Sequence, residues 1–359
     1  MKILQVIDSL PPTSGGSRFV ANLSKELAAR AMKVDVLLVD GKDSHFVNEL
    51  ESNGIHVIKL DINARSRFRI KYILQIARVM KGYNIIHVHV FPASYLVALA
   101  TFFNATVPLV FTEHSSYNRR ATHKIFRFIE KIIYSRFKII VCLSEQVYSF
   151  VQKNLNTPAS KLRIIQNAID SEAVNKAIPY SKERLGFKRS DFLILMSSRL
   201  DADKRHDLLI EAMTLLEDNV KLIFAGDGVT KSNLQCLVKN LNLTERVVFL
   251  GARQDVFRLM KSVDINILAS NFEGLSLAAL EAMSSSKPFI ASNVEGLDFV
   301  VNDKRLLFEN DSVSIAKMIK SLTEDDAWRA EASKISEDRA KMFNIQEMTN
   351  EYIKVYEEF

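Results

Sequence analysis

The stretch NFEGLSLAALEAM, residues 271–283, places one glutamate before a short apolar helix and a second glutamate inside it. If Ser276 caps that helix, Glu273 lies in the preceding loop and Glu281 lies about 12 Å further along the axis, at roughly 1.5 Å per residue. Paired carboxylates in glycosidases stand about 5 to 9.5 Å apart, so these two are too distant to share one proton. The spacing favours a model in which the two glutamates bind opposite ends of one elongated ligand. An anionic group of this ligand would lie at the helix N-terminus between them.

Apolar runs rich in Ile, Val and Leu alternate with helical-period stretches on the N-terminal side of this segment and continue beyond it. They cover residues 2–8, 33–40, 56–60, 85–90, 108–114, 138–144 and 162–167 in the first half, and 192–198, 220–226, 247–251, 265–270 and 288–292 in the second. Such alternation is typical of β-α units around a parallel sheet. The sequence therefore predicts an α/β fold with two Rossmann-like, doubly wound domains that face each other across a cleft.

A polar stretch with little strand character separates the two series of runs. We expect an N-terminal domain over residues 1–168, a linker or hinge over 169–190, and a C-terminal domain over 191–342. A final helix over 343–359 is expected to pack back on the N-terminal domain. Because open α/β sheets bind ligands beyond the carboxyl ends of their strands, the loops that follow the strands are expected to carry the chemistry.

The composition is that of an ordinary globular chain, with 48% hydrophobic and 25% charged residues. No apolar run reaches the roughly 18 residues of a membrane span, and the first residues, MKILQVID, lack the apolar stretch of a signal peptide. A cytoplasmic location is therefore expected. Cys142 and Cys236 have no His or Cys partner at metal-ligand spacing, which disfavours a disulfide scaffold and structural zinc.

The two halves of the chain differ in charge. Residues 1–165 hold 23 basic and 11 acidic residues, a net charge of +12, so with +6 for the whole chain the remainder carries −6. Two stretches concentrate the excess: Arg65, Arg67, Arg69, Lys71, Arg78 and Lys81 in the first, and Arg119, Arg120, Lys124, Arg127, Lys131, Arg136 and Lys138 in the second. Basic residues interleaved with Phe, Tyr and Ile suit a helix that lies on an anionic membrane.

A solvated helix that packs its apolar stripe on the domain is the alternative explanation of these basic stretches. Nucleic acid is a weaker candidate, because no nucleic-acid-binding module accompanies the charge. We therefore expect a peripheral contact with an anionic membrane through the basic N-terminal domain, and no nucleic-acid partner.

A glycine pair follows the first expected strand. Gly15 and Gly16 stand in SLPPTSGGSRF, before a helix expected from about Ser17, where they would let a ligand approach the backbone closely. An ordinary glycine-rich turn is the alternative. The segment has neither the G-x-G-x-x-G fingerprint nor the P-loop pattern, which disfavours a dinucleotide or P-loop site.

Two cations follow the first strand of the second domain. Arg199 and Lys204 lie in SSRLDADKRHDLLIEA, before a helix expected from about Arg205, an arrangement that suits a diphosphate. A surface pair neutralised by Asp201 and Asp203 is equally compatible with the sequence.

Glycines 226 and 228 form a tight turn after the next strand. Gly226 and Gly228 in FAGDGVT again permit close approach of the backbone. Together with the preceding loop and the two glutamates, they suggest a ligand with hydroxyl groups at both ends and a diphosphate between them, which is a nucleotide sugar.

Three histidines stand at or near strand ends. His87 and His89 alternate along one strand, which is compatible with metal ligation but is more typical of core or second-layer groups. His114 follows a strand and opens onto SSYN, where its side chain could reach into a crevice and contact a substrate.

Five of these motifs, in this order, resemble those of the GT-B-fold retaining glycosyltransferases of family 4, also called glycosyl transferases group 1. They are SGGSRF (14–19), QNAID (166–170), SRLDADKRHDLLIEA (198–212), AGDG (225–228) and EGLSLAALE (273–281). The resemblance covers nearly the whole chain. It implies a GT-B fold in which the N-terminal domain binds the acceptor and the C-terminal domain binds the nucleotide sugar.

The resemblance also implies roles for individual residues. Glu281 would hold the ribose hydroxyls, Glu273 would position the donor sugar, and His114 would contact the sugar. Arg199 and Lys204 would stabilise the departing nucleoside diphosphate. The amides around Leu275 to Leu277 would bind phosphate, and the donor-binding set is completed by Gly15, Gly16, Gly226, Gly228, Gly274 and Ser276.

Neither a metal ion nor a protein nucleophile is expected. The resemblance implies that cations and a helix dipole replace Mg²⁺, and that retention proceeds by departure and attack on one face of the sugar. The sequence departs from the family pattern at Ala168, where Gly is favoured, at Ser276, where Pro is frequent, and at Arg205, where Gly is usual. These departures leave the identity of the donor sugar open.

The expected function is transfer of a sugar from a nucleotide sugar, with UDP as the expected nucleotide, to a lipid-linked glycan in cell-surface polysaccharide biosynthesis. We expect no cofactor apart from this co-substrate, and a cytoplasmic enzyme peripheral to the inner face of the cell membrane. Three alternatives are a non-catalytic nucleotide-sugar-binding partner of a transferase complex, a nucleotide-sugar epimerase of the same fold and a nicotinamide oxidoreductase. The missing dinucleotide fingerprint disfavours the last of these.

Overall fold

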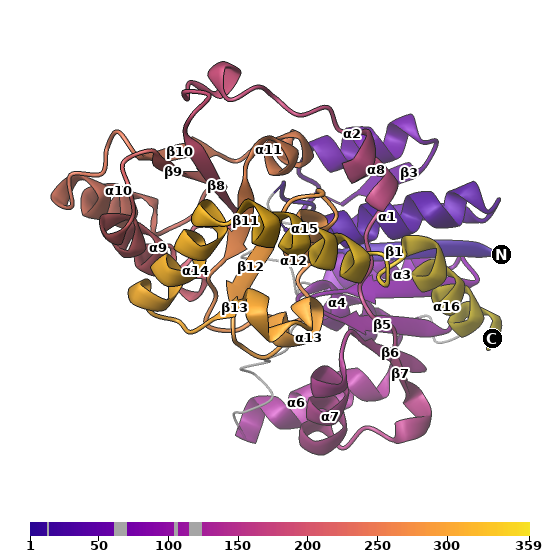
Figure 1. Cartoon of the computed structure of the whole chain (residues 1–359). Helices are drawn as coiled ribbons and strands as arrows, with labels where there is room; N and C mark the ends of the chain where they lie inside the picture. Colours follow the sequence, from indigo (N-terminus) through magenta and orange to yellow (C-terminus); the bar gives the residue numbers. More distant parts are fainter. Residues whose placement is uncertain (13, 61–69, 104–106, 115–123) are drawn as a thin grey trace. The chain divides into compact units, whose positions relative to one another are not determined.

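The computed structural model describes the chain except residues 13, 61–69, 104–106 and 115–123. The described chain forms two compact units (Figure 1). Unit 1 consists of Met1–Asn167 together with Ile345–Phe359, and unit 2 consists of Ala168–Asn344.

Unit 1 is built on a parallel sheet of seven strands in the order β3-β2-β1-β4-β5-β6-β7. The strands are β1 (Lys2–Ile7), β2 (Lys33–Leu38), β3 (His56–Lys59), β4 (Ile85–His89), β5 (Leu109–Glu113), β6 (Ile139–Cys142) and β7 (Leu162–Ile164). Each falls within one of the expected apolar runs. The central strands are completely buried, as is usual for a parallel sheet covered by helices on both faces.

The helices of unit 1 follow the strands. They are α1 (Gly15–Ala29), α2 (His45–Ser52), α3 (Ile70–Met80), α4 (Ala93–Ala100), α6 (Lys124–Ser135), α7 (Glu145–Leu155) and α16 (Ile345–Glu357), with a short 3-10 helix η2 (Ala159–Lys161). The helix expected from about Ser17 begins two residues earlier, because the Ser14 side chain accepts a hydrogen bond from the Ser17 amide at 3.4 Å. Helix α16 packs against α1 and buries Tyr352 and Tyr356.

Unit 2 is built on a second parallel sheet, of six strands in the order β10-β9-β8-β11-β12-β13. Its strands are β8 (Phe192–Ser197), β9 (Val220–Ala225), β10 (Val247–Gly251), β11 (Ile265–Leu268), β12 (Phe289–Ser292) and β13 (Leu307–Phe308). The predicted α/β class with two parallel-sheet domains is therefore confirmed. Strand β13 was not predicted, because two residues carry no detectable pattern.

The helices of unit 2 are mostly short. They are α8 (Ser171–Lys176), α9 (His206–Ala212), α10 (Lys231–Asn240), α11 (Val256–Ser262), α12 (Leu277–Met283), α13 (Leu297–Val301), α14 (Ser312–Glu324) and α15 (Asp326–Ala340). Single-turn 3-10 helices lie between them: η3 (Glu183–Leu185), η4 (Ala202–Lys204), η5 (Met213–Leu215) and η6 (Lys304–Leu306). No helix of the described ranges combines the length and apolarity that a membrane span requires.

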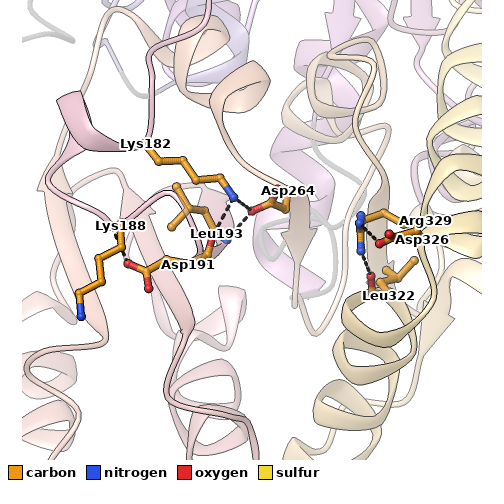
Figure 2. A network of polar contacts seen from close by, with 8 residues as sticks. All are labelled: Lys182, Lys188, Asp191, Leu193, Asp264, Leu322, Asp326 and Arg329. Carbon is orange, nitrogen blue, oxygen red and sulfur yellow. Dashed lines mark hydrogen bonds and ion pairs between the residues drawn. The ribbon is translucent and has the colours of Figure 1, made fainter.

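The segment expected to be a linker, residues 169–190, contains α8 and η3 and is fastened to the sheet of unit 2. The Lys182 ammonium donates to the Asp264 carboxylate and to the Asp191 carbonyl, at 2.6 Å each. The Leu193 amide donates to the same carboxylate oxygen of Asp264 at 2.7 Å, so this group joins the segment to the amino ends of β8 and β11 (Figure 2). These contacts lie at the amino ends of the strands. The loops that were expected to carry the chemistry lie at the carboxyl ends.

Candidate active site

The loops after β8 and β11 bring two of the predicted residues together. The Lys204 ammonium forms an ion pair and a hydrogen bond with the Glu273 carboxylate, and their side chains are only 18% and 10% exposed. The Ser270 hydroxyl donates to the same Glu273 oxygen at 2.9 Å. The Asn271 amide donates to the Asp203 carbonyl at 2.8 Å, which ties the two loops together through their backbones.

Arg199 lies in the same loop as Lys204 but has a different partner. Its guanidinium pairs with Asp201 at 2.9 Å, and its side chain is 57% exposed. The alternative of a neutralised surface pair therefore describes Arg199 in this structure but does not describe Lys204. An exposed guanidinium with one carboxylate partner is free to turn toward a diphosphate at little cost.

The GDG turn packs against the Arg199 loop. A Cβ on Gly226 would lie 1.9 Å from the Ser198 carbonyl oxygen, and a Cβ on Gly228 would lie 2.4 Å from the Leu200 carbonyl oxygen. The Leu200 amide donates to the Asp227 carbonyl at 3.0 Å. These glycines are therefore required by contact between two protein loops, whatever ligand lies beside them.

Helix α12 carries the second glutamate. Ser276 is its N-cap residue by backbone conformation, although the Ser276 side chain makes no capping hydrogen bond. Gly274, Leu275 and Ser276 precede the helix, Leu277 opens it, and Glu281 is buried in its second turn. The two glutamates thus belong to separate elements, one in the loop and one in the helix, as expected for a helix capped at Ser276.

Sequence reasoning missed three residues that hold the Glu273 loop. Gly296 has a φ of +89°, and a Cβ there would lie 2.3 Å and 2.5 Å from the carbonyl oxygens of Glu273 and Gly274. The Asn310 side-chain amide donates to the Ser270 carbonyl at 2.9 Å, and the Ser270 hydroxyl contacts Glu273 as described above. Only the position of Ser270 at a strand end signalled a role; the other two lie far along the chain.

In unit 1, the predicted glycines follow the carboxyl end of β1 and His114 follows the carboxyl end of β5. Gly15 and Gly16 form the first turn of α1 rather than the loop before it. A Cβ on Gly16 would lie 3.8 Å from a Val90 methyl group, which is ordinary contact with the end of β4. The Phe19 ring, one turn further along α1, packs edge-on against the His114 ring with centroids 4.9 Å apart.

The two alternating histidines of β4 are completely buried and hydrogen-bonded. His87 contacts the Tyr356 hydroxyl through Nδ1 at 2.7 Å and the Thr112 hydroxyl through Nε2 at 2.8 Å. Burial lowers the pKa of His87 and of His89 well below the usual value, and neighbouring histidines lower both further. Within the described part of the chain, no group of three or more His, Cys, Asp or Glu side chains is arranged to hold a metal ion.

Comparison with known proteins identifies the class of this chain as a glycosyltransferase. Residues 13–173 match the model of Glycosyltransferase Family 4, and residues 178–341 match that of Glycosyl transferases group 1. The chain therefore belongs to the group 1 glycosyltransferase family, as the sequence motifs predicted.

Two enzymes illustrate the family. An N-acetylgalactosamine-N,N'-diacetylbacillosaminyl-diphospho-undecaprenol 4-alpha-N-acetylgalactosaminyltransferase of Campylobacter jejuni is 26% identical over 95% of this chain and 96% of its own length. A UDP-Gal:alpha-D-GlcNAc-diphosphoundecaprenol alpha-1,3-galactosyltransferase of Escherichia coli is 28% identical over 71% of this chain and 70% of its own length.

Solved structures share the fold. HepE of Anabaena, solved in complex with UDP and glucose, superposes with a TM-score of 0.87 at 22% identity, over 100% of both chains. The lipopolysaccharide glycosyltransferase WaaG gives a TM-score of 0.76 at 15% identity, over 99% of both chains. The fold class is therefore that of the GT-B glycosyltransferases.

Proposed function

We propose that this chain transfers a sugar from a UDP-sugar to a lipid-linked glycan in cell-surface polysaccharide biosynthesis, with retention of anomeric configuration and without a metal ion. The observation that carries the proposal is the ion pair between Lys204 and Glu273, at the carboxyl ends of β8 and β11 in a chain of this family. Two relatives named above act on diphospho-undecaprenol-linked sugars by name, and HepE was solved with UDP. These likenesses support the donor and acceptor classes.

In this proposal, different residues bind the diphosphate, the sugar and the ribose of the donor. Lys204 and Arg199 stabilise the charge that develops on the departing diphosphate, Lys204 as a point charge and Arg199 as a planar fork. The donor diphosphate competes with Glu273 for Lys204, which frees the Glu273 carboxylate to accept hydrogen bonds from the sugar. Glu281 accepts hydrogen bonds from the ribose.

Main-chain amides complete the proposed donor site. The amides of 274–277 bind phosphate, and the turn containing Gly226 and Gly228 lets the donor approach the Arg199 loop. Cations and amides that are already oriented toward the departing diphosphate stabilise its charge, as Mg²⁺ does in other enzymes. The reaction is therefore expected to proceed in the presence of a chelator.

Titration of a UDP-hexose into the wild type and into Glu281→Ala tests the donor site. A charged hydrogen bond contributes about 1.5 to 3 kcal/mol, so the variant is expected to bind roughly 10- to 100-fold more weakly. Glu217→Ala, which removes an exposed glutamate just before the amino end of β9, is the control and should bind as the wild type does. Equal affinity of Glu281→Ala and wild type, with both proteins folded, would exclude the ribose role.

We also propose that α6 rests on an anionic membrane at the cytoplasmic face. This helix exposes Phe126 by 49%, Phe128 by 66% and, less strongly, Ile129 and Ile132. The sequence of this helix contains Lys124, Arg127 and Lys131, and Arg136 follows its C-terminal end. Apolar side chains flanked by cations match the acyl boundary and the anionic headgroups of a bilayer.

A neighbouring loop extends this apolar and cationic surface. The Arg136 guanidinium lies 4.2 Å from the centroid of the Phe102 ring, whose residue is 61% exposed, and Phe103 beside it is 49% exposed.

Of the first basic stretch, Lys71 and Arg78 lie on α3. Arg65, Arg67 and Arg69 lie outside the described residues, as do Arg119 and Arg120 of the second stretch.

Co-sedimentation with liposomes of phosphatidylglycerol at low salt tests the membrane proposal. Since burying a phenylalanine side chain contributes about 1.5 to 3 kcal/mol, the double variant Phe126→Ser/Phe128→Ser is expected to bind at least about tenfold more weakly. Phe359→Ser removes a phenylalanine that is 50% exposed at the chain end and serves as the control. Wild-type protein that stays in the supernatant, or a double variant that binds as the wild type does, would contradict the proposal.

A further inference from the structure

A chain of hydrogen bonds runs through the centre of unit 1, from the C-terminal helix to His114. The Gln5 amide nitrogen donates to the Tyr356 hydroxyl of α16 at 3.4 Å, and the Gln5 amide oxygen contacts His89 Nε2 at 2.6 Å. His89 Nδ1 contacts His114 Nε2 at 3.2 Å. Gln5 and His89 are completely buried, so each must satisfy its polar atoms within this chain of contacts.

The histidines of this chain are neutral at neutral pH. Burial lowers the pKa of His114 to about 4, and it lowers the pKa of His89 well below the usual value. A neutral imidazole carries one N–H, which donates, and one bare nitrogen, which accepts. The partner of one ring nitrogen therefore decides what the other ring nitrogen can do.

The Gln5 oxygen fixes the direction of every bond in the chain. A carboxamide oxygen only accepts, so His89 Nε2 carries the hydrogen and His89 Nδ1 is bare. Because a bare Nδ1 only accepts, His114 Nε2 must donate to it. The hydrogen of His114 is thus on Nε2, and His114 Nδ1 carries a lone pair.

The second branch of the network runs from Gln5 through Tyr356 and His87 to Thr112. The orientation of the Gln5 amide also fixes the direction of these hydrogen bonds. The Tyr356 hydroxyl accepts from Gln5 and donates to His87 Nδ1 at 2.7 Å. His87 Nε2 then carries the hydrogen and donates to the Thr112 hydroxyl at 2.8 Å. Both ring nitrogens of His87 and both ring nitrogens of His89 therefore have hydrogen-bond partners, as buried polar groups require.

We propose that Gln5 and His89 are positioning residues that hold His114 in the tautomer whose Nδ1 accepts a hydrogen bond from a hydroxyl group of the bound sugar. His114 is partly exposed, and no residue of the described ranges is hydrogen-bonded to its Nδ1. A bare ring nitrogen selects a hydroxyl donor and discriminates against a deoxy position or an anionic substituent. The sugar contact of His114 is the one that the family resemblance implies, so this part of the inference rests on the proposed function, whereas the tautomer does not depend on it.

Nitrogen NMR of the ¹⁵N-labelled imidazoles of the whole protein tests the tautomer without any substrate. We expect His114, His89 and His87 each to show a protonated Nε2 and a bare Nδ1. A hydrogen on Nδ1 of His114 would overturn the proposal, because it would mean that the Gln5 amide is turned over and the whole chain runs in reverse.

Adding a saturating UDP-hexose then tests the hydroxyl contact. A hydrogen bond accepted by the bare nitrogen is expected to shift the His114 Nδ1 resonance toward lower frequency. Saturation is followed independently through the uridine signals. A saturated protein in which this resonance does not move would overturn the hydroxyl contact and leave donor binding intact, whereas failure to saturate would count against the proposed function instead.

Three variants separate an effect on the position of His114 from an effect on stability alone. Gln5→Met removes the acceptor and is expected to mix the two tautomers of His114 and to lower kcat/KM about tenfold, while Gln5→Glu keeps an acceptor oxygen and should restore most of the activity. Thr112→Val breaks the other branch of the same network. It is expected to lower the melting temperature but to leave the His114 tautomer and kcat/KM unchanged. A Gln5→Met protein with the wild-type tautomer and kcat/KM would contradict the proposal.

Discussion

Lys204→Ala is expected to lower kcat by about 10²- to 10³-fold at saturating donor, because one preorganised charge aimed at the leaving group typically contributes that much. In the absence of donor, Lys204 pairs with Glu273, so the substitution also leaves a carboxylate that is 10% exposed with the Ser270 hydroxyl as its remaining contact from the β11 loop. Some loss of stability is therefore expected alongside the loss of rate. Steady-state kinetics and thermal unfolding measure the two effects separately.

Lys182→Ala is the matched control for this variant. Lys182 pairs with Asp264 in the same unit (Figure 2), and these side chains are 24% and 22% exposed. The pair lies at the amino ends of β8 and β11, whereas Lys204 and Glu273 follow the carboxyl ends of these strands. We expect it to lose stability comparably and to keep its kcat within about twofold, since it makes no contact with the proposed donor site. If both variants lost kcat to the same extent, the role of Lys204 in leaving-group stabilisation would be refuted.

Gly296→Ala is expected to displace the Glu273 loop and to lower kcat/KM by about 100-fold, since a shift of roughly 1 Å in a positioning element can cost that much. The new methyl group would meet the backbone carbonyls of Glu273 and Gly274, which no side-chain rotation can relieve. The positive φ of Gly296 adds a cost of about 1 to 2 kcal/mol for any residue other than glycine. Kinetics with the purified variant and its melting temperature measure both effects.

Gly186→Ala separates the effect of the close contact from the effect of the positive φ. Gly186 has a φ of +87°, almost the same as that of Gly296, but a Cβ there meets nothing within 4 Å. This variant is expected to show the conformational cost alone and to keep wild-type kcat/KM. Should Gly296→Ala behave like Gly186→Ala in the kinetic assay, the close contact would have no bearing on the position of Glu273.

The sequence was sufficient to predict the parts of the fold that depend on local patterns. Buried parallel strands appear as apolar runs, and all but one of the strands were found in this way. The rule that ligands bind beyond the carboxyl ends of strands correctly grouped Lys204 with Glu273, which are 69 residues apart. Strand β13 was missed because Leu307–Phe308 is too short for a period to be recognised.

Contacts between distant residues could not be predicted. Nothing in the sequence around Gly296 indicates that its backbone touches the Glu273 loop, and nothing around Gln5 indicates a bond to Tyr356, 351 residues away. The sequence indicated that His87 and His89 were polar groups on a buried strand, but it could not give their partners. Those partners, which set the tautomers, come from β1, β5 and α16 and are fixed only by the fold.

The central claim, that the loops of unit 2 form a donor site for a metal-independent glycosyltransferase, is tested most directly by the release of free nucleotide. Purified protein is incubated with UDP-, GDP- and ADP-hexoses in EDTA, and the liberated nucleoside diphosphate is quantified. We predict slow hydrolysis of one UDP-hexose in preference to the others, and no effect of the chelator. Absence of binding and hydrolysis with every sugar nucleotide, or activity that EDTA abolishes, would contradict this account.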